Sequence, residues 1–234
     1  MSTTTEGFRY SQLSPEAKAV ARKWWRGTGW TGWDDHGALH ELLDDELAHT
    51  HGLTDCRLHY SLSCCQGDGV AFEGNPDLEV WAKSDERMAA ILGQMTLWLV
   101  AHRVDEHNFY CTITHNGHNG HYCHSNSMTL DISRELWPPA GADMDWWAGV
   151  EEDFHELLTG LEEYCGERIK AISKALEETG YAAIEYHESD EYIDETLKAH
   201  DGRYLWDEGG DFLEWVAIVQ PAVLCATRRQ TEGR

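Results

Sequence analysis

Apolar and polar residues alternate along parts of the chain, and a period of two predicts β-strands with one buried face. The first such part begins at Leu58, where every second residue is apolar, and the alternation resumes up to Phe72 after a glycine-rich segment. The pair Asp68-Gly69 lies in that segment and suits a tight turn, because Gly adopts positive φ freely and Asp tolerates it. We therefore expect a β-hairpin over residues 58–74.

Two further hairpins are expected from the same kind of pattern. One joins the alternating segments 109–114 and 127–132 through a histidine-rich stretch that contains two Asn-Gly pairs, which are turn signals. The other joins residues 204–206 to residues 212–219 near the end of the chain.

Apolar residues three and four positions apart predict amphipathic helices in the remaining segments. The expected helices span residues 14–25, 33–48, 85–102 and 145–179, and a shorter one begins at Ser189. The helix over 145–179 has the strongest signal, since its apolar stripe continues for about six turns. We expect Gly180 to end this helix as a C-cap residue and a short strand to follow over residues 181–186.

The order of these elements predicts the α+β class, with an antiparallel sheet built from hairpins and packed against several helices, including the long one near 145–179. The Pro- and Gly-containing loop at 138–142 is a possible boundary, but we interpret residues 1–234 as a single domain.

The net charge of the chain indicates which classes of molecule could bind it. The chain has 42 acidic and 18 basic residues and a formal net charge of −24 at pH 7. Such a chain repels nucleic acid and anionic membranes and is steered toward basic proteins, among which nucleic-acid-binding proteins are common. The alternative is that the acidity only keeps the protein in solution.

The first residues of the chain are polar and lack the apolar core of a signal peptide, and no apolar run is long enough to span a membrane. The seven cysteines have no regular spacing, which is typical of reduced thiols rather than of a disulfide framework. These observations favour the cytoplasm.

A basic partner would need exposed acidic residues and an apolar anchor. The acidic residues that lie off the apolar helical stripes, and are therefore candidates for an interface, are Asp44, Asp45, Glu151, Glu152, Glu162 and Glu163. Trp146 and Trp147 are candidate anchors. Adjacent residues on a helix point about 100° apart, so these two side chains cannot be equally buried.

Four stretches resemble, in their order, a family carried by bacteriophages and prophages: LSPEAKAVARKWW, SLSCCQGDGVAFEG, HNGHYCHSNSMTLDI and SDEYIDETLKAHDGRYLWDEGGDF. Its members often bear the label "antitoxin of toxin–antitoxin stability system", and the resemblance covers roughly residues 10–212. The most specific motif residues are Gln66, Gly67, Asp68, Gly69, Phe72 and Gly74, together with the run from His118 to His124. The chain departs from the family pattern at Cys64, Cys65 and Cys123. The resemblance implies a small accessory protein of a mobile element, and such proteins often bind a host protein.

The histidine-rich stretch is a candidate zinc site. His115, His118, His121 and His124 recur every three residues, and imidazole is a good zinc ligand. Residues three apart in a strand face opposite sides, so a chelate of His118, His121 and His124 needs an irregular loop. The alternative is a polar hairpin end with solvated histidines.

Two other features have a structural and a chemical interpretation. Asp68 either stabilises a turn or assists a metal site beside the histidines. Cys64 and Cys65 either pack as ordinary thiols or form a Cys/His pair with His59 or His121. The sequence contains no GxSxG, Walker A, HExxH or CxxC motif.

We therefore carry three hypotheses. The preferred one is a non-enzymatic acidic protein, without a cofactor, that occupies the basic nucleic-acid-binding surface of a host protein, such as a defence factor, as a nucleic-acid mimic would. The second is a metal-dependent hydrolase or nuclease that uses His118, His121 and His124 with zinc. The third is a structural or regulatory phage protein that acts by self-association.

Overall fold

The computed structural model describes residues 7–28, 36–63, 67–104, 107–117 and 122–215. The chain divides into two compact units. One contains Met1–Asp34 and Tyr186–Arg234, and the other contains Asp35–Glu185. The sequence pattern favours a single domain, and the loop at 138–142 that it offers as a possible boundary lies inside the second unit.

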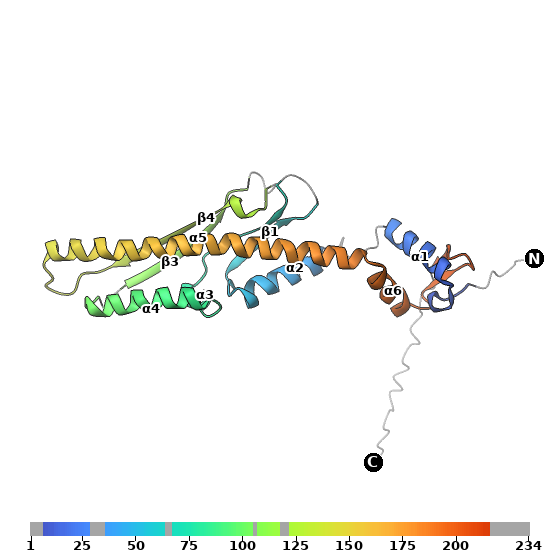
Figure 1. Cartoon of the computed structure of the whole chain (residues 1–234), viewed down its shortest axis with the longest axis horizontal. Helices are drawn as coiled ribbons and strands as arrows, with labels where there is room; N and C mark the ends of the chain where they lie inside the picture. The colour runs from blue at the N-terminus through green and yellow to red at the C-terminus, as the bar shows by residue number, and fades with distance from the viewer. Residues whose placement is uncertain (1–6, 29–35, 64–66, 105–106, 118–121, 216–234) are drawn as a thin grey trace, which may run out of the picture. The chain divides into compact units, whose positions relative to one another are not determined.

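The second unit is built on a four-stranded antiparallel sheet with the order β1-β2-β3-β4 (Figure 1). Its strands are β1 (Cys56–Ser61), β2 (Gly69–Gly74), β3 (His107–His115) and β4 (Met128–Leu136). β1 and β2 form one hairpin and β3 and β4 the other, each paired along its whole length, whereas β2 and β3 are joined only at Gly74 and Ile113. The predicted α+β class and both predicted hairpins of this sheet are confirmed.

The connection between β1 and β2 differs from the expected tight turn. β1 ends at Ser61 and Gly69 is already the first residue of β2, so residues 62–68 form the connection. The carboxylate of Asp68 accepts hydrogen bonds from Ser61 Oγ at 2.7 Å and from the Ser63 backbone N at 2.8 Å. Asp68 therefore holds this longer connection against the end of β1, which agrees with its structural interpretation.

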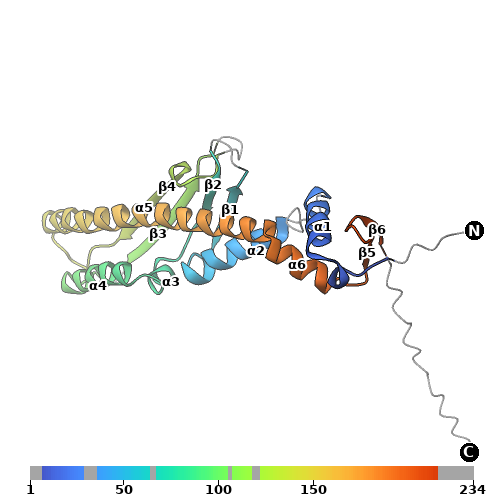
Figure 2. The same ribbon diagram turned by 45° about the vertical axis from the view of Figure 1, so that its right-hand side comes forward.

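Helices lie along this sheet (Figure 2). They are α2 (His36–Asp45), which continues into a π-helical turn (Glu46–Thr50), α3 (Leu78–Ala82), α4 (Glu86–Ala101) and α5 (Met144–Glu188). In both views α5 runs beside the strands along most of its length. The short helix α3 was not expected from the sequence.

α5 covers the sheet with the apolar stripe that the sequence predicts. Phe154, Leu158, Leu161, Cys165, Ile169, Ile172 and Leu176 are buried. The ring of Phe154 lies 5.0 Å from that of Trp98 on α4 and 5.9 Å from that of Phe109 on β3, measured between centroids. Phe154 thus joins two helices and the sheet in one core.

The predicted end of this helix is wrong, as is the predicted strand over 181–186. α5 continues through Gly180 to Glu188 without a break. Gly180 is buried, and a Cβ built on it would meet Leu62 Cδ1 at 2.5 Å. Gly180 therefore serves as a close-packing position inside the helix and not as a C-cap.

The first unit contains α1 (Pro15–Gly27), α6 (Asp190–Ala199) and a two-stranded sheet of β5 (Tyr204–Trp206) and β6 (Phe212–Trp215). Its core is aromatic, with Tyr10, Trp25 and Trp206 buried and Trp24 stacked on Phe212 at 4.4 Å between ring centroids. The predicted start of α6 at Ser189 is confirmed, because its side chain accepts a hydrogen bond from Tyr192 N. None of the described helices combines the length and the apolar composition that crossing a membrane requires.

Candidate functional site

Five of the six acidic residues proposed for an interface are exposed. Asp44 and Asp45 lie at the end of α2, and Glu151, Glu152 and Glu163 lie on α5. Glu162 differs, because it is half-buried and its Oε1 accepts a hydrogen bond from the backbone N of Ile132 at 3.2 Å. This carboxylate satisfies a backbone donor of the edge strand β4 and is not available to a partner.

The two tryptophans at the start of α5 separate as helical geometry requires. Trp146 is 45% exposed and Trp147 is 3% exposed. Trp146 lines a hollow of about 320 Å³ together with Ala101–Arg103 and Pro139–Ala142. Of these two tryptophans, Trp146 is therefore the one that is placed to contact another molecule.

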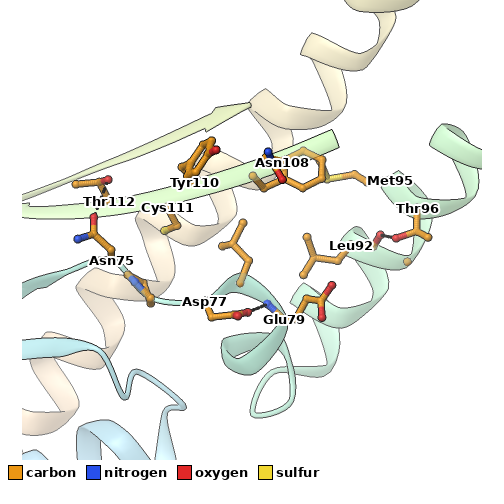
Figure 3. Close-up of a pocket in the computed structure, with 14 residues that line it drawn as sticks. Asn75, Asp77, Glu79, Leu92, Met95, Thr96, Asn108, Tyr110, Cys111 and Thr112 are labelled. Carbon is orange, nitrogen blue, oxygen red and sulfur yellow. Dashed lines mark hydrogen bonds between the residues drawn. The ribbon is translucent and has the colours of Figure 1, made fainter. Parts of the chain in front are cut away.

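A groove of about 560 Å³ lies beside β3 (Figure 3). Its walls are residues 75–79, part of α4 and residues 108–112 of β3. Side chains of a strand alternate between its two faces, and in Figure 3 Tyr110 and Cys111 point to opposite sides of β3. Since five consecutive residues of β3 line the groove, it follows the edge of the strand.

This edge of β3 is open along most of its length. The backbone N of Asn116 donates to Ser127 O at 2.7 Å, so alternate residues from Asn116 back to Asn108 direct their peptide groups toward β4. The peptide groups of Cys111 and Ile113 then face the other way. β2 reaches this side only at Ile113, and no other described strand pairs with it between His107 and Thr112.

The groove is acidic. Asp77 and Glu79 contribute carboxylates to its lining, and none of the described residues that line it is a lysine, an arginine or a histidine. Asp77 is partly engaged, since its Oδ1 accepts hydrogen bonds from Glu79 N at 2.8 Å and Val80 N at 3.1 Å as the N-cap of α3. Glu79 is exposed, and Figure 3 shows its side chain among the residues that line the groove.

The family-motif residues around β2 have structural roles. Phe72 is fully buried in the sheet's core. Gly69 has a φ of +146°, and a Cβ built on it would lie 2.5 Å from the backbone O of Cys123. An added Cβ at Gly74 would likewise meet the backbone of Asp55, and one at Gly67 the ring of Tyr122. Gln66 lies outside the described residues. Glycine at these three positions therefore leaves room for neighbouring backbone or side-chain atoms that a larger residue would meet.

The predicted histidine chelate is only partly within the described residues. His118 and His121 lie outside them, and the Nδ1 of His124 accepts a hydrogen bond from Asn126 N at 3.1 Å. His124 therefore caps the turn Ser125–Ser127.

A different set of ligand-type residues comes together instead. His59 on β1, Glu73 on β2 and His115 on β3 each offer one ligand atom, and these atoms lie within 4.8 Å of one another. His115 belongs to the histidine-rich stretch that the sequence pattern singles out, but nothing in the sequence around Glu73 indicates a metal ligand. The grouping depends on the contact between β2 and β3, which only the fold reveals.

The thiols of the four described cysteines, of which Cys56 is half-buried and the others are buried, are not suited to nucleophilic chemistry. Burial raises the pKa of Cys56, Cys111 and Cys165 to about 12 each. Burial, with the nearby charge of Asp68, also raises the pKa of Cys123. These thiols are protonated at neutral pH and pack as small apolar groups. Cys64 and Cys65 lie outside the described residues.

Comparison with curated proteins and with solved structures finds no match. One family model, described as a domain of unknown function (DUF8835), matches residues 34–198. This range contains the whole β1–β4 sheet with helices α2 to α5, and therefore both the groove and the His/Glu/His group. Because the match covers well over half of the chain, the protein belongs to the DUF8835 family.

Proposed function

We propose that this chain is a non-enzymatic acidic binding protein of a phage or prophage. It binds a host protein that has a basic, nucleic-acid-binding surface, and it inhibits or modulates that protein stoichiometrically. The single observation that carries the proposal is the acidic groove along the open edge of β3. The net charge of −24 and the exposed acids of α2 and α5 support it.

An open strand edge recognises extended peptides. Its unpaired peptide groups form main-chain hydrogen bonds with an added strand, and flanking side chains select the sequence of that strand. Between Asn75–Glu79 and β3 the groove is about 560 Å³, which is enough for a few residues of extended chain.

The walls of the groove define the preferred segment. Leu92 and Met95 of α4 supply apolar surface, while Asp77 and Glu79 supply negative charge, and none of the described lining residues is a cation. A segment that alternates apolar residues with lysine or arginine matches both features. The basic side chains of nucleic-acid-binding proteins fit this description.

The remaining acids act at longer range. Asp44, Asp45, Glu151, Glu152 and Glu163 are exposed, so they add to the field that attracts a basic partner and accelerates encounter. They need no specific contact to do so. The groove then determines where the partner's segment docks.

Affinity capture from a lysate of the bacterial host, followed by measurement of the equilibrium affinity for the captured protein, tests the proposal. Glu79→Lys reverses the free charge of the groove and should weaken binding about tenfold, a change of about 1.4 kcal/mol. Glu16→Lys is the matched control, because Glu16 is also an exposed glutamate in the first turn of a helix, α1. Equal affinities for the two variants, or capture of acidic proteins only, would contradict the proposal.

A further inference from the structure

Three neighbouring strands of the β1–β4 sheet bring two histidines and a glutamate together. His59 lies opposite Ala71 in the β1–β2 register, and Glu73 lies two residues further along β2, on the same face of the sheet as Ala71. His115 approaches from β3, and its ring centroid is 4.7 Å from that of His59. One ligand atom from each of the three residues lies within 4.8 Å of the other two.

The contact between His59 and Glu73 has the spacing of two ligands on one ion. His59 Nε2 lies 3.0 Å from Glu73 Oε1. Ligands about 2.0–2.1 Å from a tetrahedral zinc ion stand about 3.3 Å apart, so little movement is needed. The two side chains are 22% and 37% exposed, which leaves the group accessible to a small ion.

The contact between His59 Nε2 and Glu73 Oε1 does not have the alignment of a hydrogen bond. The nitrogen is buried and lies 3.0 Å from the carboxylate oxygen, so only charge attraction to a protonated His59 joins the two groups when no ion is present. A metal ion between them would bind the lone pair of a neutral His59 and the carboxylate at the same time.

His115 makes a backbone hydrogen bond that fixes the tautomer of its neutral ring. Its Nε2 lies 2.8 Å from the backbone O of Tyr122, and an imidazole nitrogen can only donate to a carbonyl oxygen. The proton therefore sits on Nε2, and the lone pair is on Nδ1. A second hydrogen bond of this kind fixes the tautomer and the ring orientation of metal ligands.

Gly117 keeps this arrangement in place. A Cβ built on Gly117 would collide with the His115 ring and with Tyr122 O, the two groups that form this hydrogen bond. Only glycine lets the chain pass so close to the hydrogen bond between them. The local sequence thus favours one orientation of His115.

We infer that His59, Glu73 and His115 form a binding site for a divalent first-row transition-metal ion, with zinc the best match to two imidazoles and one carboxylate. Three protein ligands leave a fourth position for water. This site is separate from the groove beside β3 and does not depend on the proposed binding function. It also differs from the His118, His121 and His124 chelate that the sequence predicts.

The test is a zinc titration of the full-length, tag-free, chelator-treated protein in competition with a chromophoric chelator. Wild-type protein should bind one equivalent of Zn²⁺, and zinc should raise its thermal midpoint. Glu73→Gln keeps the size of the side chain and should lower the affinity for zinc at least tenfold and abolish the thermal shift, and His59→Ala should do the same. His155→Ala is the control, because His155 is exposed on α5 of the same unit, and this variant should bind zinc as wild type does.

Circular dichroism of the zinc-free variants separates lost binding from lost folding. Should His59→Ala fail to fold, the result for the more conservative Glu73→Gln variant decides the question. The inference is overturned if wild-type protein binds no zinc. It is also overturned if Glu73→Gln and His59→Ala bind zinc normally while His121→Ala does not, since the ion would then belong to the histidine run. Loss of zinc in all variants, including His155→Ala, would show non-specific binding and would equally overturn it.

Discussion

Gly180 of α5 faces Leu62, and a Cβ added to Gly180 would stand 2.5 Å from Leu62 Cδ1. The same Cβ would lie 3.8 Å from both methyl groups of Leu43 on α2. This close approach joins the long helix to the connection between β1 and β2. The contact with Leu62 explains why α5 contains a glycine at this position and continues beyond it.

Replacing Gly180 tests that contact. Gly180→Val should destabilise the protein by about 1–3 kcal/mol, because the added methyl groups must displace Leu62. Gly160→Ala on the same helix should stabilise it by about 0.5–1 kcal/mol, since its surroundings are open and alanine favours a helix. Urea denaturation measures both. If Leu62→Ala restores none of the stability lost in Gly180→Val, the two residues are not coupled.

Phe72 should be essential to the core of the sheet. Its side chain is fully buried at the centre of β2, so Phe72→Ala should cost about 3–5 kcal/mol of stability. Leu97→Ala is a suitable comparison, because Leu97 is 72% exposed and its loss should change stability by less than about 0.5 kcal/mol. Thermal denaturation of the two variants distinguishes these expectations. Similar midpoints for both would place Phe72 outside the core.

Asp85 should make stability depend on pH in the acidic range. Its Oδ1 caps α4 through Met88 N at 3.0 Å and accepts from Tyr164 Oη at 2.6 Å, while Oδ2 lies 2.8 Å from Arg168 Nε. Burial acts to raise the pKa of Asp85, but the hydrogen bonds from Tyr164 and Met88 and the charge of Arg168 hold it below its ordinary value of 3.8. A lowered folded-state pKa stabilises the protein fully above the unfolded value, and this stability is lost as pH falls through the folded value.

Asp85→Asn should therefore lose about 1–3 kcal/mol at neutral pH, because asparagine still caps the helix but cannot form the ion pair. Below the ordinary aspartate pKa of 3.8 the stabilities of the two proteins should converge. Urea titrations of wild type and variant over a series of pH values give this difference directly. A difference that stays constant down to strongly acidic pH would show that the charge of Asp85 contributes nothing.

Local sequence patterns were sufficient to predict most of the helices and strands. The alternation around Leu58 and Phe72 predicts β1 and β2, and the stripe that contains Phe154 predicts α5, because these signals need only neighbouring residues. The Ser189 cap was predictable for the same reason. Where the helix ends was not predictable, since the role of Gly180 depends on Leu62, more than a hundred residues away.

The candidate sites depend on longer-range relationships. The groove exists because β2 leaves the sheet at Gly74 while β3 continues, and no pattern within either strand encodes that difference in length. The grouping of His59 with Glu73 and His115 requires the order of the strands. Likewise, Glu162 has the helical position of an exposed acid, and only the nearby β4 backbone engages it.

The central claim is that exposed acids draw a basic partner to this protein, and the association rate with the captured partner tests it most directly. The comparison is between wild type and a variant in which Asp44, Asp45, Glu151, Glu152 and Glu163 are replaced by lysine, with Glu162 left intact because it binds β4. Rates are measured at ionic strengths of about 0.05 M and about 0.5 M, where screening lengths differ severalfold. Wild type should associate much faster at low than at high ionic strength, and the variant, with an unchanged thermal midpoint, should associate slowly at both. Equal association rates for the two proteins at low ionic strength would contradict the claim.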